Sequence, residues 1–226
     1  MSTTNPYHIL PPHIPKRLDA GQLSFIESDA FHESFLLVSS DLSGQSASLA
    51  RFEQVIFKRV IFNRTKIPKA RFIDCRFEES DLSQADLEGS RSMRVALTGC
   101  RLIGAQWIDA QLDDVTFKEC NLEGAVFSSA GFKSARFERC LLKNAFFDHA
   151  NLTNVVFDHC DLTGAYLQGA TLTGADLRGS TIDGVHVNAD NLHGAIVDSL
   201  QAVQIAHLLG LTVKEPGEDL FPEDRK

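Results

Sequence analysis

Residues 51–90 read RFEQV IFKRV IFNRT KIPKA RFIDC RFEES DLSQA DLEGS when the chain is cut into blocks of five from Arg51. The cut holds without a slip to Val197, and an apolar residue fills the second position of twenty-nine of the thirty blocks that begin with the one containing Phe52. Ser92 is the exception. The fifth position is nearly always Ala, Val, Cys, Ser or Thr, and the other three positions are mostly polar. The chain therefore repeats with a period of five over about two thirds of its length.

A period of five matches neither an α-helix, which repeats every ~3.6 residues, nor a flat strand, which repeats every second residue. It requires a chain that turns the same way every five residues and sends one large and one small side chain inward. Such a unit cannot bury its apolar side chains alone, but stacked coils share a continuous core. Each inward Phe or Leu contributes about 1.5–3 kcal/mol of burial, which over so many positions outweighs local helix preference. The repeat predicts an all-β rod with a filled interior.

Three segments of the repeat share one motif: Ala85-Asp86-Leu87, Ala150-Asn151-Leu152 and Ala175-Asp176-Leu177. They resemble the A(D/N)LXX motif of the pentapeptide-repeat family. The resemblance implies a right-handed quadrilateral β-helix with four repeats, or twenty residues, in each coil. Leu42 and Ala47 keep the same phase, so about eight coils are expected.

The inward positions are expected to stack in columns twenty residues apart. The five cysteines all occupy the small fifth position, and the last four would form one ladder: Cys75, Cys100, Cys120, Cys140 and Cys160. Metal sites typically use clustered cysteines with CxxC-like spacing, which this sequence lacks. Disulfides form in oxidising compartments, whereas we expect a cytoplasmic protein. We therefore interpret the cysteines as small hydrophobes that fill narrow space. A second inward ladder would comprise Phe57, Phe77, Leu97, Phe117, Phe137, Phe157, Leu177 and Val197.

The phase of the repeat divides the chain into four parts. Residues 1–35 break the phase and are expected to form an arm that covers the open first coil, because an exposed β-edge invites aggregation. Residues 36–199 would form the β-helix, in which Ser92 predicts a local defect of the coil. Residues 200–213 would form a helix and a strand, and residues 214–226 a charged tail. The apolar cover of the first coil would come from Phe25, Ile26, Phe31 and Phe35.

The segment after Val197 predicts a short α-helix that Asp198 or Ser199 caps and Gly210 ends, followed by a strand at 211–213. Through Gln201-Ala202 and Leu208-Leu209-Gly210 it resembles the ending of the Qnr and MfpA type of pentapeptide-repeat proteins. That resemblance implies a homodimer joined tail to tail through the C-terminal ends. The candidate interface residues are Leu200, Val203, Ile205, Leu208, Leu209, Leu211 and Val213.

The composition excludes several classes of protein. The formal charge is −8 and the pI is about 5.4, whereas nucleic-acid binders carry basic patches, so direct nucleic-acid binding is disfavoured. No apolar run approaches the ~20 residues that span a bilayer. Prolines interrupt the N-terminal region where a signal peptide would be apolar. We expect a cytoplasmic protein that does not contact membranes.

The sequence contains no pattern that indicates catalysis. GxxxxGKS/T, GxSxG and HExxH are absent, and a filled rod with flat faces offers no concavity in which polar groups converge. We therefore expect no enzyme, no catalytic or metal-binding residues and no cofactor.

The family resemblance implies a DNA mimic that binds a type II topoisomerase, either DNA gyrase or topoisomerase IV, and that either inhibits it or protects it from quinolones or other gyrase poisons. Mimicry requires negative charge that faces a basic saddle. Residues 141–200 carry seven acidic and two basic side chains, beside the expected dimer seam. No face is uniformly acidic, and such charge also occurs on ordinary solubilising surface. The candidate acidic surface comprises Asp148, Asp158, Asp161, Asp176, Asp183 and Asp198.

The alternative hypothesis is a non-catalytic scaffold or protein-interaction module without a topoisomerase partner. Val126, Phe146 and Tyr166 are twenty residues apart at outward positions, so they would form one apolar column. Such a column on a water-soluble rod either marks a binding site or lies under the N-terminal arm. A continuous negative potential across the dimer seam would favour the mimic, and a bare apolar column would favour the scaffold.

Overall fold

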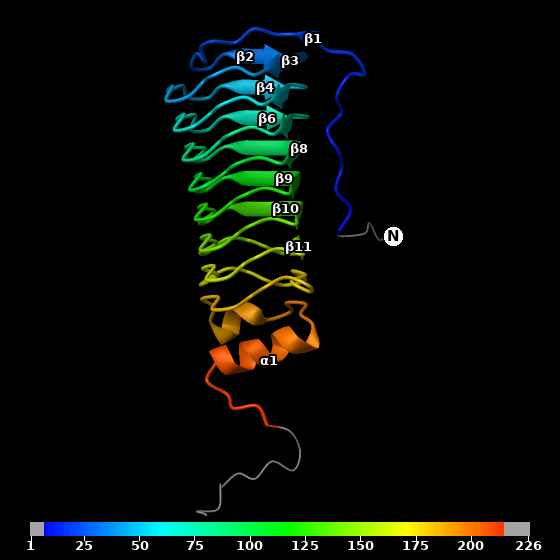
Figure 1. The fold of residues 1–226 in the computed structure, drawn as a ribbon, viewed down its shortest axis with the longest axis vertical. Coiled ribbons are helices and arrows are strands. Elements are labelled where there is room, and N and C mark those ends of the chain that lie inside the picture. Colours follow the sequence, from blue (N-terminus) through cyan, green and yellow to red (C-terminus); the bar gives the residue numbers. More distant parts are fainter. Residues whose placement is uncertain (1–6, 215–226) are drawn as a thin grey trace, which may run out of the picture.

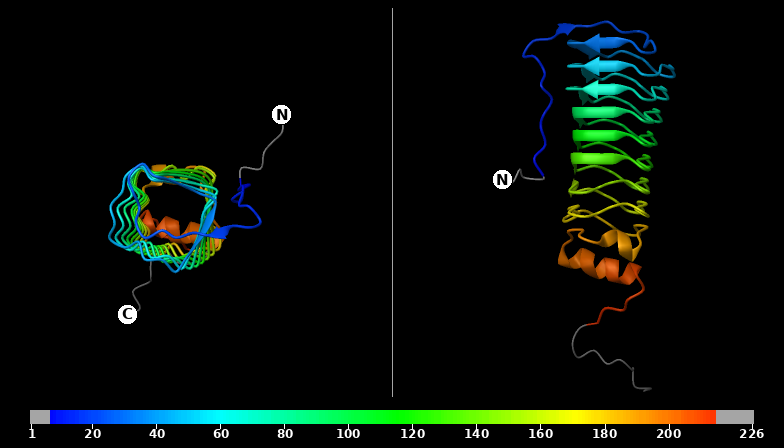
Figure 2. Two further views of the ribbon diagram at one scale, coloured as in Figure 1. Left: turned by 90° about the horizontal axis from the view of Figure 1, so that it is seen from above. Right: turned by 180° about the vertical axis from the view of Figure 1, so that it is seen from behind.

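The computed structural model describes residues 7–214, which form a right-handed quadrilateral β-helix of about 7 turns. The number of turns is close to the eight that the repeat predicts. Figure 2 shows the square cross-section from above and the stacked coils from the side. The predicted charged tail lies outside the described residues, except for Lys214. No helix among residues 7–214 is long and apolar enough to cross a membrane.

All the paired strands are parallel, and each residue pairs with one a single coil away. Phe57 pairs with Phe77, for example, and Leu97 with Phe117. The early strands are short, whereas the three long ones pass a corner and continue along the next face. The strands are β1 (Asp19–Ala20), β2 (Phe31–Glu33), β3 (Phe35–Val38), β4 (Arg51–Glu53), β5 (Ile56–Lys58), β6 (Arg71–Ile73), β7 (Arg76–Glu78), β8 (Arg91–Thr98), β9 (Gln111–Lys118), β10 (Gly131–Glu138) and β11 (Val156–Asp158).

Each coil has four faces, and a second-position side chain at the centre of each face points inward. We number the faces first to fourth by the inward columns that begin at Phe52, Phe57, Phe62 and Ile67. These columns form a single buried core. Aromatic rings stack along them, with centroids 4.6 Å apart for Phe57–Phe77 on the second face. The predicted ladder on that face is buried from Phe57 to Leu177, and Val197 at its end is partly buried.

The corners explain why the repeat contains five residues. In most blocks the fourth residue has left-handed backbone geometry, with φ of 53° at Asp74 and 70° at Gly174. One such residue turns the chain by about a quarter of the square before the next inward side chain. Glycine adopts this conformation without strain, which accounts for the Gly-rich blocks near the C-terminal end of the rod.

Residues 19–30 cover the first coil, as predicted for the arm. β1 pairs with β3, and Ile26 is fully buried, with its N–H donating to Gln45 Oε1 at 2.8 Å. Phe35 packs partly buried against the core, but Phe25 and Phe31 are exposed and contribute no cover. Coil-to-coil pairing already begins at β2, a few residues before the expected boundary at residue 36.

Residues 7–18 do not lie over the first coil. They lie along the side of the rod, and in chain order they run from beside the later coils to the first coil (Figures 1 and 2). Tyr7, near the start of the described chain, reaches the carbonyl oxygen of Gly174 at 3.3 Å. The prolines of this stretch keep it extended, and a repeat-based reading of the sequence gives no indication of its path.

The opposite end is closed by a 3₁₀-helix, η1 (Ala189–Leu192), and by α1 (Ser199–Leu208). As predicted, Asp198 caps α1: its carboxylate accepts from Gln201 N at 3.0 Å, and Gln201 Oε1 accepts from Asp198 N at 3.0 Å. Gly210 follows with φ of 82°. The predicted strand at 211–213 is absent from the single chain, in which those residues have no strand to pair with.

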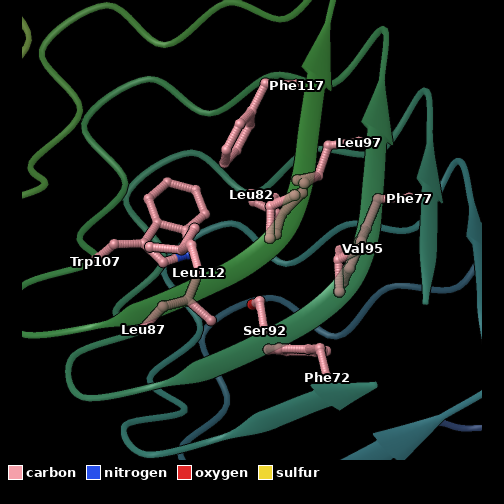
Figure 3. A pocket seen from close by; sticks show the side chains of 11 residues that line it. Phe72, Phe77, Leu82, Leu87, Ser92, Val95, Leu97, Trp107, Leu112 and Phe117 are labelled. Carbon is pink, nitrogen blue, oxygen red and sulfur yellow. The ribbon is translucent and has the colours of Figure 1, made fainter. Parts of the chain in front are cut away.

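Ser92 produces the predicted local defect, but the backbone of the coil is undistorted. Ser92 sits within β8 and pairs in register with Phe72 and Leu112. The irregularity lies in the packing, because the small side chain leaves an internal cavity of about 20 Å³ that is otherwise lined by apolar side chains (Figure 3). Backbone pairing between coils therefore holds the repeat even where an inward side chain is missing.

We predict that Ser92→Leu fills this cavity and raises the free energy of unfolding by about 1 kcal/mol. Chemical denaturation monitored by circular dichroism measures the change. Ser180→Leu is the matched control, since Ser180 is also buried but its Oγ accepts from Cys160 N and donates to Phe157 O. There we expect a loss of about 1–3 kcal/mol. A lower stability of Ser92→Leu would contradict the cavity interpretation.

Candidate interaction surfaces

The six acidic residues singled out in the sequence lie on three different faces. Asp158, Asp176 and Asp198 belong to the second face, and Asp161 and Asp183 to the third. Asp148 is on the fourth. The period of twenty already places them so, and in-register pairing such as that between Phe137 and Phe157 fixes it. The rod therefore does not bring these carboxylates together into one acidic surface.

Most of these carboxylates have partners within the chain. Asp176 pairs with Arg178 at 2.7 Å, Asp158 with Arg136 at 3.2 Å and Asp161 with Lys143 at 3.2 Å. The Arg178 hydrogen bond holds the pKa of Asp176 below its ordinary value, although burial opposes this.

The other three candidates differ from one another. Asp183 accepts from Gln204 Nε2 at 2.7 Å, and Asp198 caps α1. Backbone N–H groups of Gln201 and Gly179 lower the pKa of Asp198. The Asp148 carboxylate has neither an ion pair nor a hydrogen bond within residues 7–214. It is the one candidate whose charge is fully available to a partner.

The predicted apolar column is present and is longer than the sequence reading gave. Phe146 and Tyr166 stack with ring centroids 4.6 Å apart, and His186 continues the stack at 4.3 Å from Tyr166. The sequence analysis did not predict His186 as part of the column, because imidazole is not an apolar side chain. The spacing of twenty residues between Tyr166 and His186 nevertheless follows the repeat. Val126, Phe146 and Tyr166 are half-buried, and His186 is exposed.

The aromatic column (Val126, Phe146, Tyr166, His186) lies on the fourth face. The N-terminal arm makes its hydrogen bonds at the corner between the first and second faces, so it does not cover the column. Asp148 and Gln168 run beside the column on the same face. Gln168 Oε1 is buried and accepts no hydrogen bond from the described residues. The column is thus an aromatic strip bordered by two side chains with unused acceptor atoms.

The predicted dimer interface residues divide into two groups. Ile205 packs against the core, and Gln201, which belongs to the same resembling segment, is buried, with its Nε2 donating to Leu177 O at 2.6 Å and Ser180 O at 2.7 Å. Together they plug the open end of the rod. The exposed group comprises Leu200, Val203, Leu208, Leu209, Leu211 and Val213.

The cysteines are packed as predicted. All five are buried and free of disulfides, and each thiol donates to a backbone carbonyl, as Cys140 does to Phe117 O at 3.4 Å. Burial raises the pKa of Cys75 to about 12. No group of three or more His, Cys, Asp or Glu side chains among residues 7–214 is placed to hold a metal ion.

Comparison with known proteins gives the family. The family model described as the pentapeptide repeat region matches residues 50–127 and 110–187. HetL, a pentapeptide repeat protein involved in heterocyst differentiation regulation from the cyanobacterium Nostoc sp., is similar in structure with a TM-score of 0.53 and 19% identity, covering 76% of this chain and 87% of that one. At this identity the likeness concerns the fold.

Two further structures are similar over parts of the chain. QnrB1, a plasmid-mediated fluoroquinolone resistance protein, has a TM-score of 0.42 and 23% identity, covering 87% of this chain and 98% of its own. A pentapeptide repeat protein from the Arabidopsis thaliana thylakoid lumen has a TM-score of 0.40 and 30% identity, covering 41% and 65%. No curated protein matches the sequence significantly.

The period of five, the square coil and the match of the family model over residues 50–187 agree, and the chain belongs to the pentapeptide-repeat family.

Proposed function

We propose that this protein is a non-catalytic rod that binds a protein partner through its outer faces. The observation that carries the proposal is the aromatic column on the fourth face, which is half-exposed and bordered by the Asp148 carboxylate, whose charge has no ion-pair partner within residues 7–214. The core columns fill the interior, and the enclosed cavity at Ser92, of about 20 Å³, is of the size that holds a single water. Function therefore falls to the outward side chains. Members of this family are typically structural or interaction proteins.

The column has the composition of a binding hot spot. Aromatic side chains dominate the energetics of protein interfaces, and stacked rings held by β-pairing lose little conformational entropy on binding. Asp148 beside the rings would accept hydrogen bonds that fix the orientation of the partner. We infer a partner surface with apolar side chains flanked by N–H or O–H donors.

Dimerisation through the C-terminal ends belongs to the same proposal. Six apolar side chains of residues 200–213 are exposed around the outer side of α1, and the most exposed, Leu200, is 71% accessible. Residues 211–213 form no strand with any part of residues 7–214, although Leu211 N donates to Ala206 O at 2.9 Å, and a second copy would supply both an apolar surface and a strand partner.

A type II topoisomerase is the second candidate partner. The observation that favours it is the formal charge of residues 141–200, which contain seven acidic and two basic side chains. Internal ion pairs redistribute this charge, but they do not remove the excess. In a tail-to-tail dimer the two acidic regions would meet at the seam. A DNA mimic of this kind would use the general negative field of the rod end, since its carboxylates lie on three faces.

The partner site is tested by photocrosslinking in cells. We predict that benzoyl-phenylalanine at position 146 or 166 gives one shared, discrete adduct, and that Tyr166→Ser weakens the adduct formed from position 146. Position 141 is the control, because Leu141 is exposed on the third face. Either no adduct from positions 146 and 166 or an identical adduct pattern from position 141 would overturn the aromatic column as the site.

The dimer is tested by light scattering after size-exclusion chromatography. We predict twice the chain mass for the natural protein and the mass of one chain for Leu200→Asp/Leu208→Asp. Leu141→Asp should remain dimeric, although Leu141, at 47% exposure, matches Leu208, at 44%. A natural protein that elutes with the mass of one chain at micromolar concentration would refute the proposed seam.

A gyrase supercoiling assay with and without a fluoroquinolone decides the topoisomerase candidate. If that candidate is right, we expect inhibition or drug protection at low micromolar protein, weakened at least about tenfold by Asp148→Lys/Asp190→Lys through loss of the acidic field. Glu79→Lys/Glu88→Lys makes the same change of charge at two exposed positions outside residues 141–200 and should have little effect. Absence of any effect on gyrase or topoisomerase IV would exclude a topoisomerase partner and leave the aromatic column to be tested on its own.

A further inference from the structure

Residues 7–14 of the N-terminal arm form hydrogen bonds with the rod at one corner. His13 N donates to Asp74 Oδ1 at 2.8 Å, and Leu10 N donates to Asp114 Oδ1 at 3.1 Å. Gln54 Nε2 donates to His13 O at 3.3 Å, and Tyr7 Oη donates to Gly174 O at 3.3 Å. Gln54, Asp74, Asp114 and Gly174 are separated by multiples of twenty residues, so they lie in one column at the corner between the first and second faces. We call this column the arm corner.

The spacing of the arm matches the spacing of the coils. Leu10 and His13 are three residues apart, which is about 9.3 Å in a polyproline II conformation. Asp74 and Asp114 are two coils apart, which is about 9.6 Å at the usual distance between paired strands. An extended chain of this kind can therefore place one N–H group at every second coil, where the corner carries a carboxylate. An α-helix, at ~1.5 Å per residue, would not keep this register.

The sequence of the arm suits the register. The two residues between Leu10 and His13 are Pro11 and Pro12, which favour the polyproline II conformation and have no N–H. The stretch Leu10-Pro11-Pro12-His13 thus has two backbone donors, and a rod carboxylate accepts from each of them. No backbone N–H of this stretch is left without a partner.

The carboxylate at the centre of the contact is held in position before the arm arrives. Arg94 donates two hydrogen bonds of 2.6 Å to Asp74, which is 4% exposed. Burial would raise the pKa of Asp74, but the hydrogen bonds from Arg94 and His13 N outweigh it and lower that pKa. Asp74 and Asp114 both have left-handed backbone geometry, with φ of 53°. Asp74 is therefore an ionised acceptor that Arg94 holds in place.

We propose that the arm corner is a receptor for an extended, proline-containing peptide segment and that residues 7–14 are its intramolecular occupant. The ligand class is a polyproline II segment with free N–H groups at two positions three residues apart and prolines between them. The arm hides the receptor in the resting chain and exposes it on release. This site is separate from the aromatic column and from α1.

The test uses the full-length chain with its arm released. Ile9 and Ile14 are half-buried in the docked arm, so Ile9→Asp/Ile14→Asp should detach it without altering the rod. The probe is a fluorescein-labelled synthetic peptide of residues 1–18, followed by fluorescence anisotropy. We expect saturable binding to the released variant and at least about tenfold weaker binding to the natural chain, in which the arm competes.

Two variants locate the site on the released background. Asp114→Ala removes a charge-assisted acceptor and should weaken peptide binding by at least about tenfold. Asp113→Ala removes the neighbouring carboxylate, which has no hydrogen bond to the arm, and should leave binding unchanged. A peptide with Pro11→Gly and Pro12→Gly should also bind more weakly, because it loses the preformed extended conformation.

Three outcomes would overturn the proposal: no saturable binding to a released variant whose circular dichroism matches that of the natural chain, equal binding to both chains, or indifference to Asp114→Ala. Should the released variant fail to fold, amide hydrogen exchange of the natural chain decides instead. The Leu10 amide should then exchange slowly, and Asp114→Ala should accelerate it at least about tenfold while rod amides keep their rates. Fast exchange at Leu10 in the natural chain would refute the docked arm.

Discussion

The whole structure depends on in-register pairing between coils, in which many backbone N–H and carbonyl groups bond to the coil above or below, while fifth-position N–H groups such as that of Ala85 bond within their own turn. Phe62 N donates to Asp81 O and Asp81 N to Val60 O, for example, and the pattern repeats along the rod. Because the backbone satisfies itself in this way, identical side-chain positions stack, and the inward columns can be filled with whichever apolar residue fits. Ser92 shows that the pairing does not depend on a filled column: the column lacks a large apolar side chain there, and the pairing is unchanged.

The same pairing leaves the first and last coils without a neighbour on one side, and the repeat itself provides no cover for them. An open coil exposes unpaired backbone groups and apolar side chains. At one end Ile26 and β1 cover them, and at the other Gln201 supplies an amide to the carbonyls of Leu177 and Ser180. The apolar residues of α1 that remain exposed are therefore not needed to close the rod. This surplus is the physical argument for a second copy at that end.

The period of five was sufficient to predict the coil, the buried ladders and the packed cysteines, and the helix signals after Val197 predicted that Asp198 or Ser199 caps α1, where the structure has Asp198. The sequence was insufficient where contacts do not repeat. The partners of Asp158 and Asp161, namely Arg136 and Lys143, follow no repeating rule, and treating the acidic residues as free charge overstated what the surface offers. The pair of Asp176 with Arg178 was visible, because residues two apart share a face. The prolines of residues 11–15 keep the arm extended, but nothing in the repeat indicates which corner receives it.

The positions of the two surfaces have a consequence for how the rod can work. The arm corner lies beside the second face, and the aromatic column lies on the fourth face, which is opposite the second. A filled core of stacked rings separates them, and such a core resists the deformation that would couple the two sides. Binding of the proposed partner at the column would therefore neither require the proposed release of the arm nor promote it. A rigid rod of this kind acts by holding its surfaces at fixed distances, with any regulation confined to the one segment that can leave it.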